Sequence, residues 1–166
     1  MVSTSARAMD LLDQWQSPWD VRYAIIGPEG DGGRSGLVVS SADVHVHGPR
    51  GASIATVPYA GLPRVYVVPS DDARYFAIVT QDPHGVKSAS TTLVRVYGPD
   101  GAQVATHSWR VEYDDSNPPF EVSGFDGTLA VTPVYSRDPH LLLPNGARVD
   151  FAPTELIRDV DFARDT

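Results

Sequence analysis

The chain contains no cysteine among its 166 residues. Disulfide bonds, thiolate metal sites and a cysteine nucleophile are therefore excluded. Lysine is almost absent as well, because Lys87 is the single lysine among 13 lysines and arginines. With its many Ala, Gly, Pro, Asp and Val residues, this composition is typical of a bacterial genome of high GC content, and it carries no functional conclusion.

Long hydrophobic segments are missing too. No stretch approaches the roughly 20 apolar residues that a membrane-spanning helix needs. Residues 1–15 lack the charged region and the apolar run of a signal peptide. We therefore expect a cytoplasmic protein that does not enter a membrane.

Positive charge is in short supply, and the net charge is −8 at pH 7. An acidic protein repels phosphate backbones, so nucleic-acid binding is disfavoured. With 42% hydrophobic and 20% charged residues, the chain is long enough to bury a core of its own.

Signatures of catalysis and of cofactor binding are absent from the sequence. The glycine-rich residues 27–36 fit neither a P-loop nor a dinucleotide-binding pattern, and no G-x-S-x-G occurs. We assign no catalytic residue and no cofactor. An enzyme is left open, and a protein without catalytic activity is favoured.

The strongest positive signal is an internal repeat. GPRGASIAT (48–56) recurs as GPDGAQVAT (98–106) and, more weakly, as LPNGARVDF (143–151). In each copy proline presets the first corner position of a turn, and glycine supplies the positive φ that closes it. Alternating apolar residues flank the corners, so each copy predicts a β-hairpin with a loop of three or four residues. A repeat of this length is typical of stacked or radial architectures.

Further apolar strands and acidic turns fall into the same frame. They divide the chain into three units of about four strands, at roughly 22–72, 73–126 and 127–166. We expect Asp71 or Asp72, and Asp126, to accept hydrogen bonds from turn amides. Residues 1–21 are expected to be an appendage to a single β domain spanning 22–166.

Segments such as VPSDDARYFAIVT, LVRVYGPDGAQVAT and DVDFARDT resemble blades of β-propellers of the TolB and YncE type. The resemblance covers about residues 22–166 and implies fold more than function, because its motifs are turn residues. Three blades are too few for a ring, since propellers have four to eight. The fold class is therefore all-β, with about 10–12 antiparallel strands in three hairpin repeats. Either they form a propeller-like half ring or they fold as a β-sandwich or barrel.

The two ends of the chain carry separate predictions. Residues 5–16 have apolar residues on one helical face and predict a short helix. Trp15 and Trp19 anchor this helix on the β core or bind a partner. Residues 157–162 predict a strand rather than a helix.

Two groups of residues are candidates for a site. His45 and His47 lie two apart on a predicted strand and offer a weak metal site on a face that we expect to be solvated. His107, Trp109 and Tyr113 alternate along another strand, with a bulge expected near residues 106–108. With Tyr135 they are candidates to line a ligand pocket, although a core stripe is the simpler interpretation.

Three functions compete. The first is an acidic, non-catalytic interaction module that associates with itself through β edges or binds a protein partner. The second is a small β-barrel enzyme or carrier of an apolar small molecule. The third is a structural subunit of a larger assembly. We favour the first.

Overall fold

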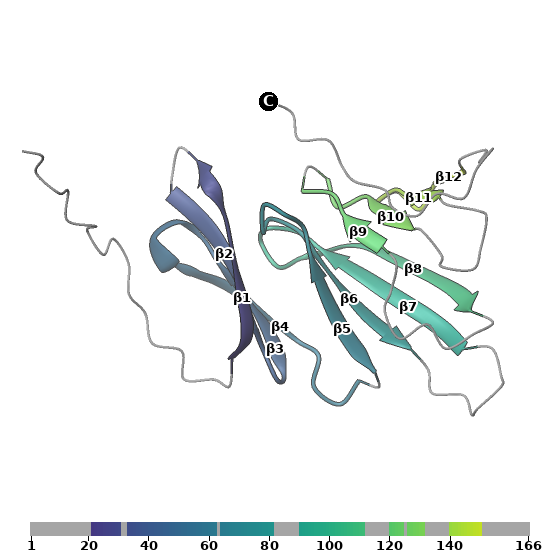
Figure 1. The fold of residues 1–166 in the computed structure, drawn as a ribbon, viewed down its shortest axis with the longest axis horizontal. Helices are drawn as coiled ribbons and strands as arrows, with labels where there is room; N and C mark the ends of the chain where they lie inside the picture. Colours follow the sequence, from purple (N-terminus) through teal and green to yellow (C-terminus); the bar gives the residue numbers. More distant parts are fainter. Residues whose placement is uncertain are drawn as a thin grey trace, which may run out of the picture.

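The computed structural model is all-β in the residues that it describes. Twelve strands form three separate four-stranded antiparallel sheets (Figure 1). The described residues are 21–30, 33–62, 64–81, 90–111, 120–124, 126–131 and 140–150. The predicted helix at 5–16 with Trp15 and Trp19, and the predicted strand at 157–162, lie outside these ranges.

The N-terminal sheet follows the chain order. It consists of β1 (Val21–Gly30), β2 (Gly33–Ser40), β3 (Asp43–His47) and β4 (Ser53–Pro58). A single 3-10 turn, η1 (Pro49–Gly51), joins β3 to β4. Valine, isoleucine and leucine at alternate positions account for these strands, because branched side chains fit a pleated, half-buried surface.

The central sheet repeats this arrangement with longer strands. Its strands are β5 (Val65–Pro69), β6 (Phe76–Gln81), β7 (Ser90–Tyr97) and β8 (Gln103–Val111), again in chain order. Each strand pairs antiparallel with its predecessor, as the alternating hydrophobic pattern predicts.

The C-terminal sheet has the same order with shorter strands. It contains β9 (Phe120–Val122), β10 (Leu129–Val131), β11 (His140–Leu142) and β12 (Arg148–Asp150). The twelve described strands are thus three copies of one four-stranded meander. None of the three sheets is closed, so the alternative of a barrel is wrong for this part of the chain.

The sheets divide the chain at other points than the predicted units. The sequence frame placed residues 65–68 at the end of the first unit, and residues 120–122 at the end of the second. The structure pairs β5 with β6 and β9 with β10, so each of these strands begins the next sheet. Six residues separate β4 (ending at Pro58) from β5 (Val65–Pro69), and six separate β5 from β6 (starting at Phe76), so the length of the connection does not reveal which sheet β5 joins.

The three repeated corners are equivalent in backbone geometry. In the second copy, the Gly98 amide N–H donates a hydrogen bond of 2.9 Å to the Ala102 carbonyl. This bond encloses a loop of three residues. The first copy has the same bond between Gly48 and Ala52, and the third has it between Leu143 and Ala147. The closing glycine has a φ between 73° and 83° in all three corners. The predicted hairpins with three-residue loops are therefore confirmed.

The bulge of β8 lies elsewhere than predicted. Pairing is regular from Ala105 to Val111, and the extra residue is Val104, between Gln103 and Ala105. The register is set by the three-residue corner, so the extra residue comes directly after it. Ile54 is the corresponding residue in β4. Both side chains lie close to the first glycine of their corners, Gly48 and Gly98.

Two hydrophobic cores separate the three sheets. The core between the N-terminal and central sheets includes Leu37, Val44, Phe76 and Ile78, each no more than 1% exposed. The core between the central and C-terminal sheets includes Val79, Val94, Leu129 and Val131. The central sheet is therefore packed on both faces, which accounts for the nearly continuous apolar residues of β5 and of the first half of β6.

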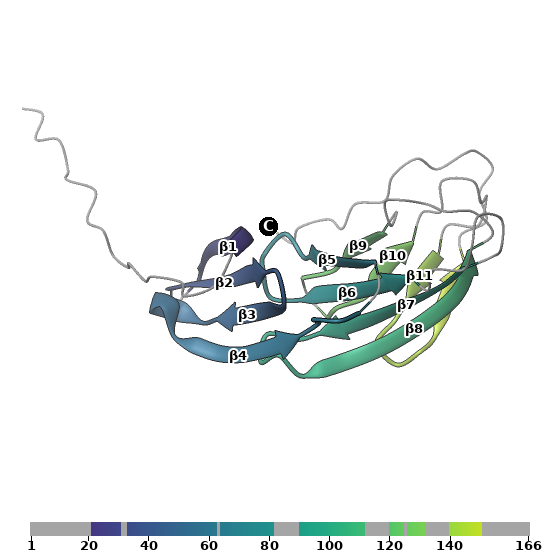
Figure 2. The same cartoon turned by 90° about the horizontal axis from the view of Figure 1, so that it is seen from below.

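The first strands of the three sheets lie along one side of the molecule. Figure 2 shows β1, β5 and β9 on this side, and β4 and β8 on the opposite side. We call β1, β5 and β9 the inner edge. At one end of it, the β5–β6 turn lies against the other two sheets. A Cβ added to Gly27 would lie 2.1 Å from the Asp72 carbonyl oxygen, and one added to Gly124 would lie 2.4 Å from the Asp72 carboxylate.

The acidic turns use their carboxylates as predicted. Asp72 Oδ1 accepts hydrogen bonds from the Arg74 amide at 3.0 Å and from Ser70 Oγ at 2.7 Å. Asp126 Oδ1 accepts one from the Thr128 amide at 2.9 Å. These bonds satisfy donors that the turn would otherwise leave without a partner.

Candidate functional site

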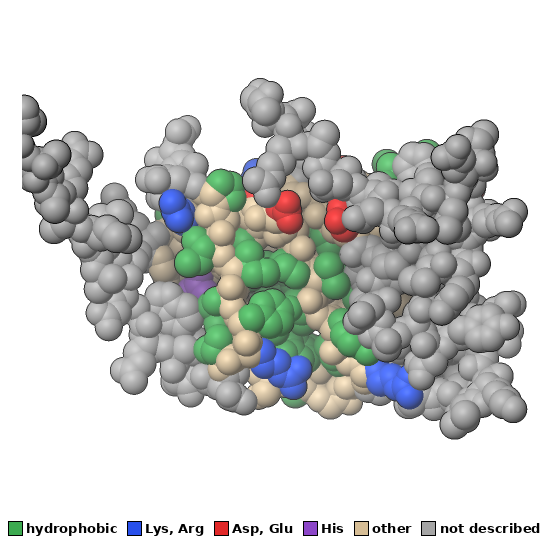
Figure 3. Space-filling model, in the orientation of Figure 1, with side chains coloured by type: hydrophobic (Ala, Val, Ile, Leu, Met, Phe, Trp, Pro, Cys, Tyr) green, Lys and Arg blue, Asp and Glu red, His purple; other side chains and the backbone are tan. Residues whose placement is uncertain are grey.

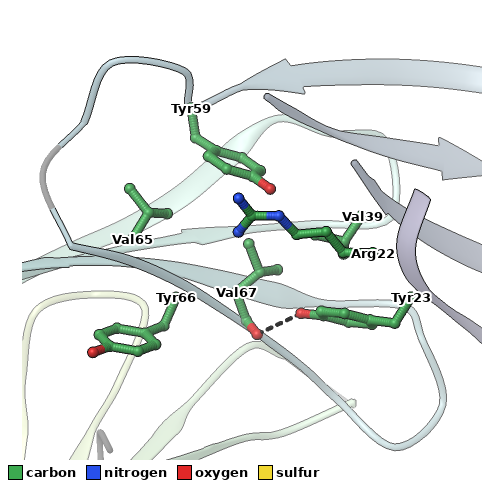
Figure 4. Close-up of a pocket in the computed structure, with 7 residues that line it drawn as sticks. All are labelled: Arg22, Tyr23, Val39, Tyr59, Val65, Tyr66 and Val67. Atoms are coloured by element: carbon green, nitrogen blue, oxygen red, sulfur yellow. Dashed lines mark hydrogen bonds between the residues drawn. The ribbon is translucent and has the colours of Figure 1, made fainter. Parts of the chain in front are cut away.

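A pocket lies on the inner edge, at the junction of the N-terminal and central sheets (Figure 4). It is lined by Arg22, Tyr23, Val39, Tyr59, Val65, Tyr66 and Val67. Its volume is about 190 Å³, and we call it the tyrosine–arginine pocket. The residues come from β1, β2, β5 and the segment after β4, so the pocket exists only because the two sheets are stacked.

Tyr23 joins the two sheets at this pocket. Its hydroxyl donates a hydrogen bond of 2.7 Å to the carbonyl of Val67 in β5 (Figure 4). Since β5 is an edge strand, this bond satisfies a carbonyl that has no strand partner on that side. Burial raises the pKa of Tyr23 to about 12, and Tyr59 adds to this rise. The hydroxyl therefore stays protonated and keeps donating.

Tyr59 forms a rigid wall of the pocket. Its side chain is 4% exposed, and its hydroxyl donates to the Ser40 carbonyl. Its amide donates to the Ala42 carbonyl at 2.8 Å, so Tyr59 is fixed to the β2–β3 turn at two points. Burial raises the pKa of Tyr59, which also keeps this hydroxyl neutral.

Arg22 is the cation of the pocket. Figure 4 shows its guanidinium between the hydroxyl of Tyr59 and the side chain of Val67. Its positive charge lowers the pKa of both Tyr23 and Tyr59, against the larger effect of burial. The guanidinium therefore lies within electrostatic range of both hydroxyls. Asp43 acts on Tyr59 in the opposite direction.

His107 and Trp109, the ligand-lining candidates within the described residues, are not among the residues that line this pocket. His107 is 8% exposed and lies opposite Val94, on the face of the central sheet that packs on the C-terminal sheet. Trp109 follows it in β8, opposite Thr92. Tyr113 and Tyr135 lie outside the described residues. These four residues therefore remain predictions as ligand-lining candidates.

His107 is nevertheless an unusual core residue. Within the described residues, its Nε2 atom and the Thr92 hydroxyl are buried without a hydrogen-bond partner. Burial lowers the pKa of His107, because an apolar environment disfavours the imidazolium form. The histidine is therefore held neutral in the core.

The prediction that His45 and His47 face solvent is wrong. They are 2% and 9% exposed, and His45 Nδ1 lies 3.1 Å from the hydroxyl of Thr56 on β4. Burial lowers the pKa of His45. The analogy with Arg95 and Tyr97 of the second repeat misled the prediction, because burial depends on what packs on each sheet. No group of three potential metal ligands occurs among the residues that the structure places.

Little in the sequence indicates the tyrosine–arginine pocket. Arg22 and Tyr23 stand in a predicted strand, but nothing local brings them near Tyr59 and Tyr66. A signal that could have indicated the pocket is that these residues lie at equivalent ends of adjoining units. It becomes informative only once the units are known to stack face to face.

The fold and the pocket define an all-β protein of three stacked meanders with a cationic pocket at one sheet junction. No protein family, no curated protein and no solved structure matches this chain. Among the described residues, no helix has the length and apolar character needed to cross a membrane.

Proposed function

We propose that this protein is a non-catalytic interaction module, a propeller-like half ring that binds a second copy of itself. Two copies supply six blades, which lies within the four to eight that closed propellers contain. In this assembly the N-terminal sheet of each copy packs against the C-terminal sheet of the other. The assembled ring then presents an acidic surface to further protein partners.

The single observation that carries the proposal is the repeated stacking of equivalent sheets without closure. Each described sheet has the same strand order, and the central sheet is covered on both faces by its neighbours. The Asp72 turn touches both neighbouring sheets at the inner edge, as sheets radiating from a common axis require. The N-terminal and C-terminal sheets each have only one described neighbour.

Apolar side chains are exposed on the edge strands of the two end sheets. Ile26 in β1 is 67% exposed and Val149 in β12 is 46% exposed. Ile26 follows Ile25, which packs inward, so it points the other way; Val149 lies opposite Leu141, which alternates with the inward Leu142. Burying them against a second copy removes apolar area from water at about 25 cal/mol per Å².

A charge placed on either end sheet tests this proposal. We expect the wild type to elute and scatter light as a dimer, and Ile26→Lys and Val149→Lys to shift the chain toward monomer. Each lysine would have to be desolvated in the interface, while it remains in water on the isolated chain. Size-exclusion chromatography with light scattering measures the mass.

Val104→Lys is the matched control. Val104 is 38% exposed. Like the two test residues, it is apolar and lies on a strand, but its strand belongs to the central sheet. It should leave the dimer intact. A wild-type monomer, or equal dissociation by all three lysines, would contradict the proposal.

The inner edge also favours a second function for the same module, namely a carrier of a small molecule. The residues of β5 are all apolar and half-buried, and Figure 3 shows hydrophobic side chains gathered over this region. An exposed apolar patch of this kind is typical of a binding surface. The alternative of a carrier for a small molecule therefore depends on the pocket beside β5.

A further inference from the structure

We propose that the tyrosine–arginine pocket binds a small carboxylic acid that has a compact apolar body and one hydrogen-bond donor. This site belongs to a single chain. It does not depend on the proposed dimer, and the two proposals fail independently.

The charge of the pocket selects an anion. Arg22 is exposed at the mouth, and no aspartate or glutamate among the described residues forms an ion pair with it. A guanidinium binds a carboxylate through two parallel N–H donors. In a chain with a net charge of −8, a cation that has no acidic partner among the described residues is a specific feature rather than part of a basic surface.

The two tyrosine hydroxyls select a donor on the ligand. Tyr23 gives its proton to the Val67 carbonyl, and Tyr59 gives its proton to the Ser40 carbonyl. Each hydroxyl has one proton and two lone pairs, so both oxygens can only accept a further hydrogen bond. Since their raised pKa values keep them neutral, they do not repel a carboxylate.

The size and lining of the pocket limit the body of the ligand. Val39, Val65 and Val67 form an apolar wall on the side of β5 that faces the N-terminal sheet, whereas the ring of Tyr66 lies on the other side of the strand (Figure 4). The volume of about 190 Å³ is below the roughly 300–1,000 Å³ of pockets for drug-sized molecules. A single aromatic ring or a short branched chain fits these limits, whereas a nucleotide does not.

The probe for the experiment is 4-hydroxybenzoate, which combines a carboxylate, one ring and a phenolic donor. Isothermal titration calorimetry on the full chain measures its affinity. We expect saturable binding in the millimolar range or tighter. Arg22→Gln should weaken binding by about tenfold or more, which corresponds to the loss of one charge-assisted hydrogen bond.

Controls separate the pocket from non-specific charge effects. Arg74→Gln removes an exposed arginine from the β5–β6 turn and should leave the affinity within about twofold of the wild type, as is usual for a surface charge outside a binding site. On the wild-type chain, the methyl ester of the probe should bind about tenfold more weakly, and benzoate should also bind more weakly. These two comparisons need no variant to fold.

Three results would overturn the inference. The first is that 4-hydroxybenzoate shows no measurable binding at millimolar concentration. The second is that the acid and its ester bind equally well, and the third is that Arg22→Gln and Arg74→Gln lose affinity equally. The mass measured by light scattering is unaffected by these outcomes, so the dimer is judged separately.

Discussion

Single residues decide how closely the three sheets approach one another. Gly101 has a φ of +74°, and a Cβ there would lie 2.4 Å from the Cβ of Ala55 on the neighbouring sheet. Gly27 and Gly124 leave room for Asp72 in the same way. Glycine at position 101 therefore serves both the turn and the contact between sheets, whereas Gly27 and Gly124 serve the contact alone.

Gly101→Ala tests this double role. Forcing alanine into a left-handed conformation costs about 1–2 kcal/mol, and the clash with Ala55 adds about 1–3 kcal/mol. Gly146→Ala is the matched control, because Gly146 has a φ of +83° and no atom within 4 Å of the added Cβ. Urea unfolding should show a larger loss of stability in Gly101→Ala, and equal losses would show that the contact between sheets is unimportant.

Because of its buried histidines, we expect the folded protein to lose stability in mild acid. Burial lowers the pKa of His107 and of His45, so the unfolded chain takes up these protons first. The stabilisation is complete above the ordinary histidine pKa of about 6.5 and declines as the pH falls through it. The free energy of unfolding should therefore fall between about pH 7 and pH 5.5.

His107→Gln identifies the residue responsible. Glutamine cannot titrate, so the free energy of unfolding of this variant should depend less steeply on pH between about pH 7 and pH 5.5. Denaturant midpoints at a series of pH values provide the measurement. A slope identical to that of the wild type would show that His107 is protonated equally in both states.

At the scale of elements, the sequence predicts what is local and misses what depends on stacking. The Pro-x-Gly corners, the strands beside them and the bonds of Asp72 and Asp126 follow from backbone preferences of a few neighbouring residues. Other features depend on which sheet packs against which. They are the assignment of β5 and β9 to their sheets, the burial of His45 and the pocket around Tyr59. Alternation within a strand does not contain that information.

The approach of β1 to the β5–β6 turn provides a test at this scale. Gly27→Ala places a methyl group against the backbone of Asp72, which cannot move as a flexible side chain can. We expect a destabilisation of about 1–3 kcal/mol, as for an overpacked core. Hydrogen exchange should be faster in β1 and β2 than in the wild type.

Gly61→Ala controls for the loss of glycine itself. Gly61 has a φ of +79°, and a Cβ there would meet no atom within 4 Å. Exchange in β1 and β2 should stay as in the wild type in this variant. If Gly27→Ala also leaves it unchanged, the turn does not hold the N-terminal sheet against the central one.

For the whole molecule, the central claim is that three equivalent sheets form half of a ring which a second copy completes. Sedimentation equilibrium of the full chain over a range of concentrations tests it most directly. At 0.5 M salt the repulsion between two chains of net charge −8 is screened beyond about 4–5 Å. We expect a mass of twice 17.9 kDa, whereas a constant mass of 17.9 kDa at every concentration would show that the ring is not completed by a second copy.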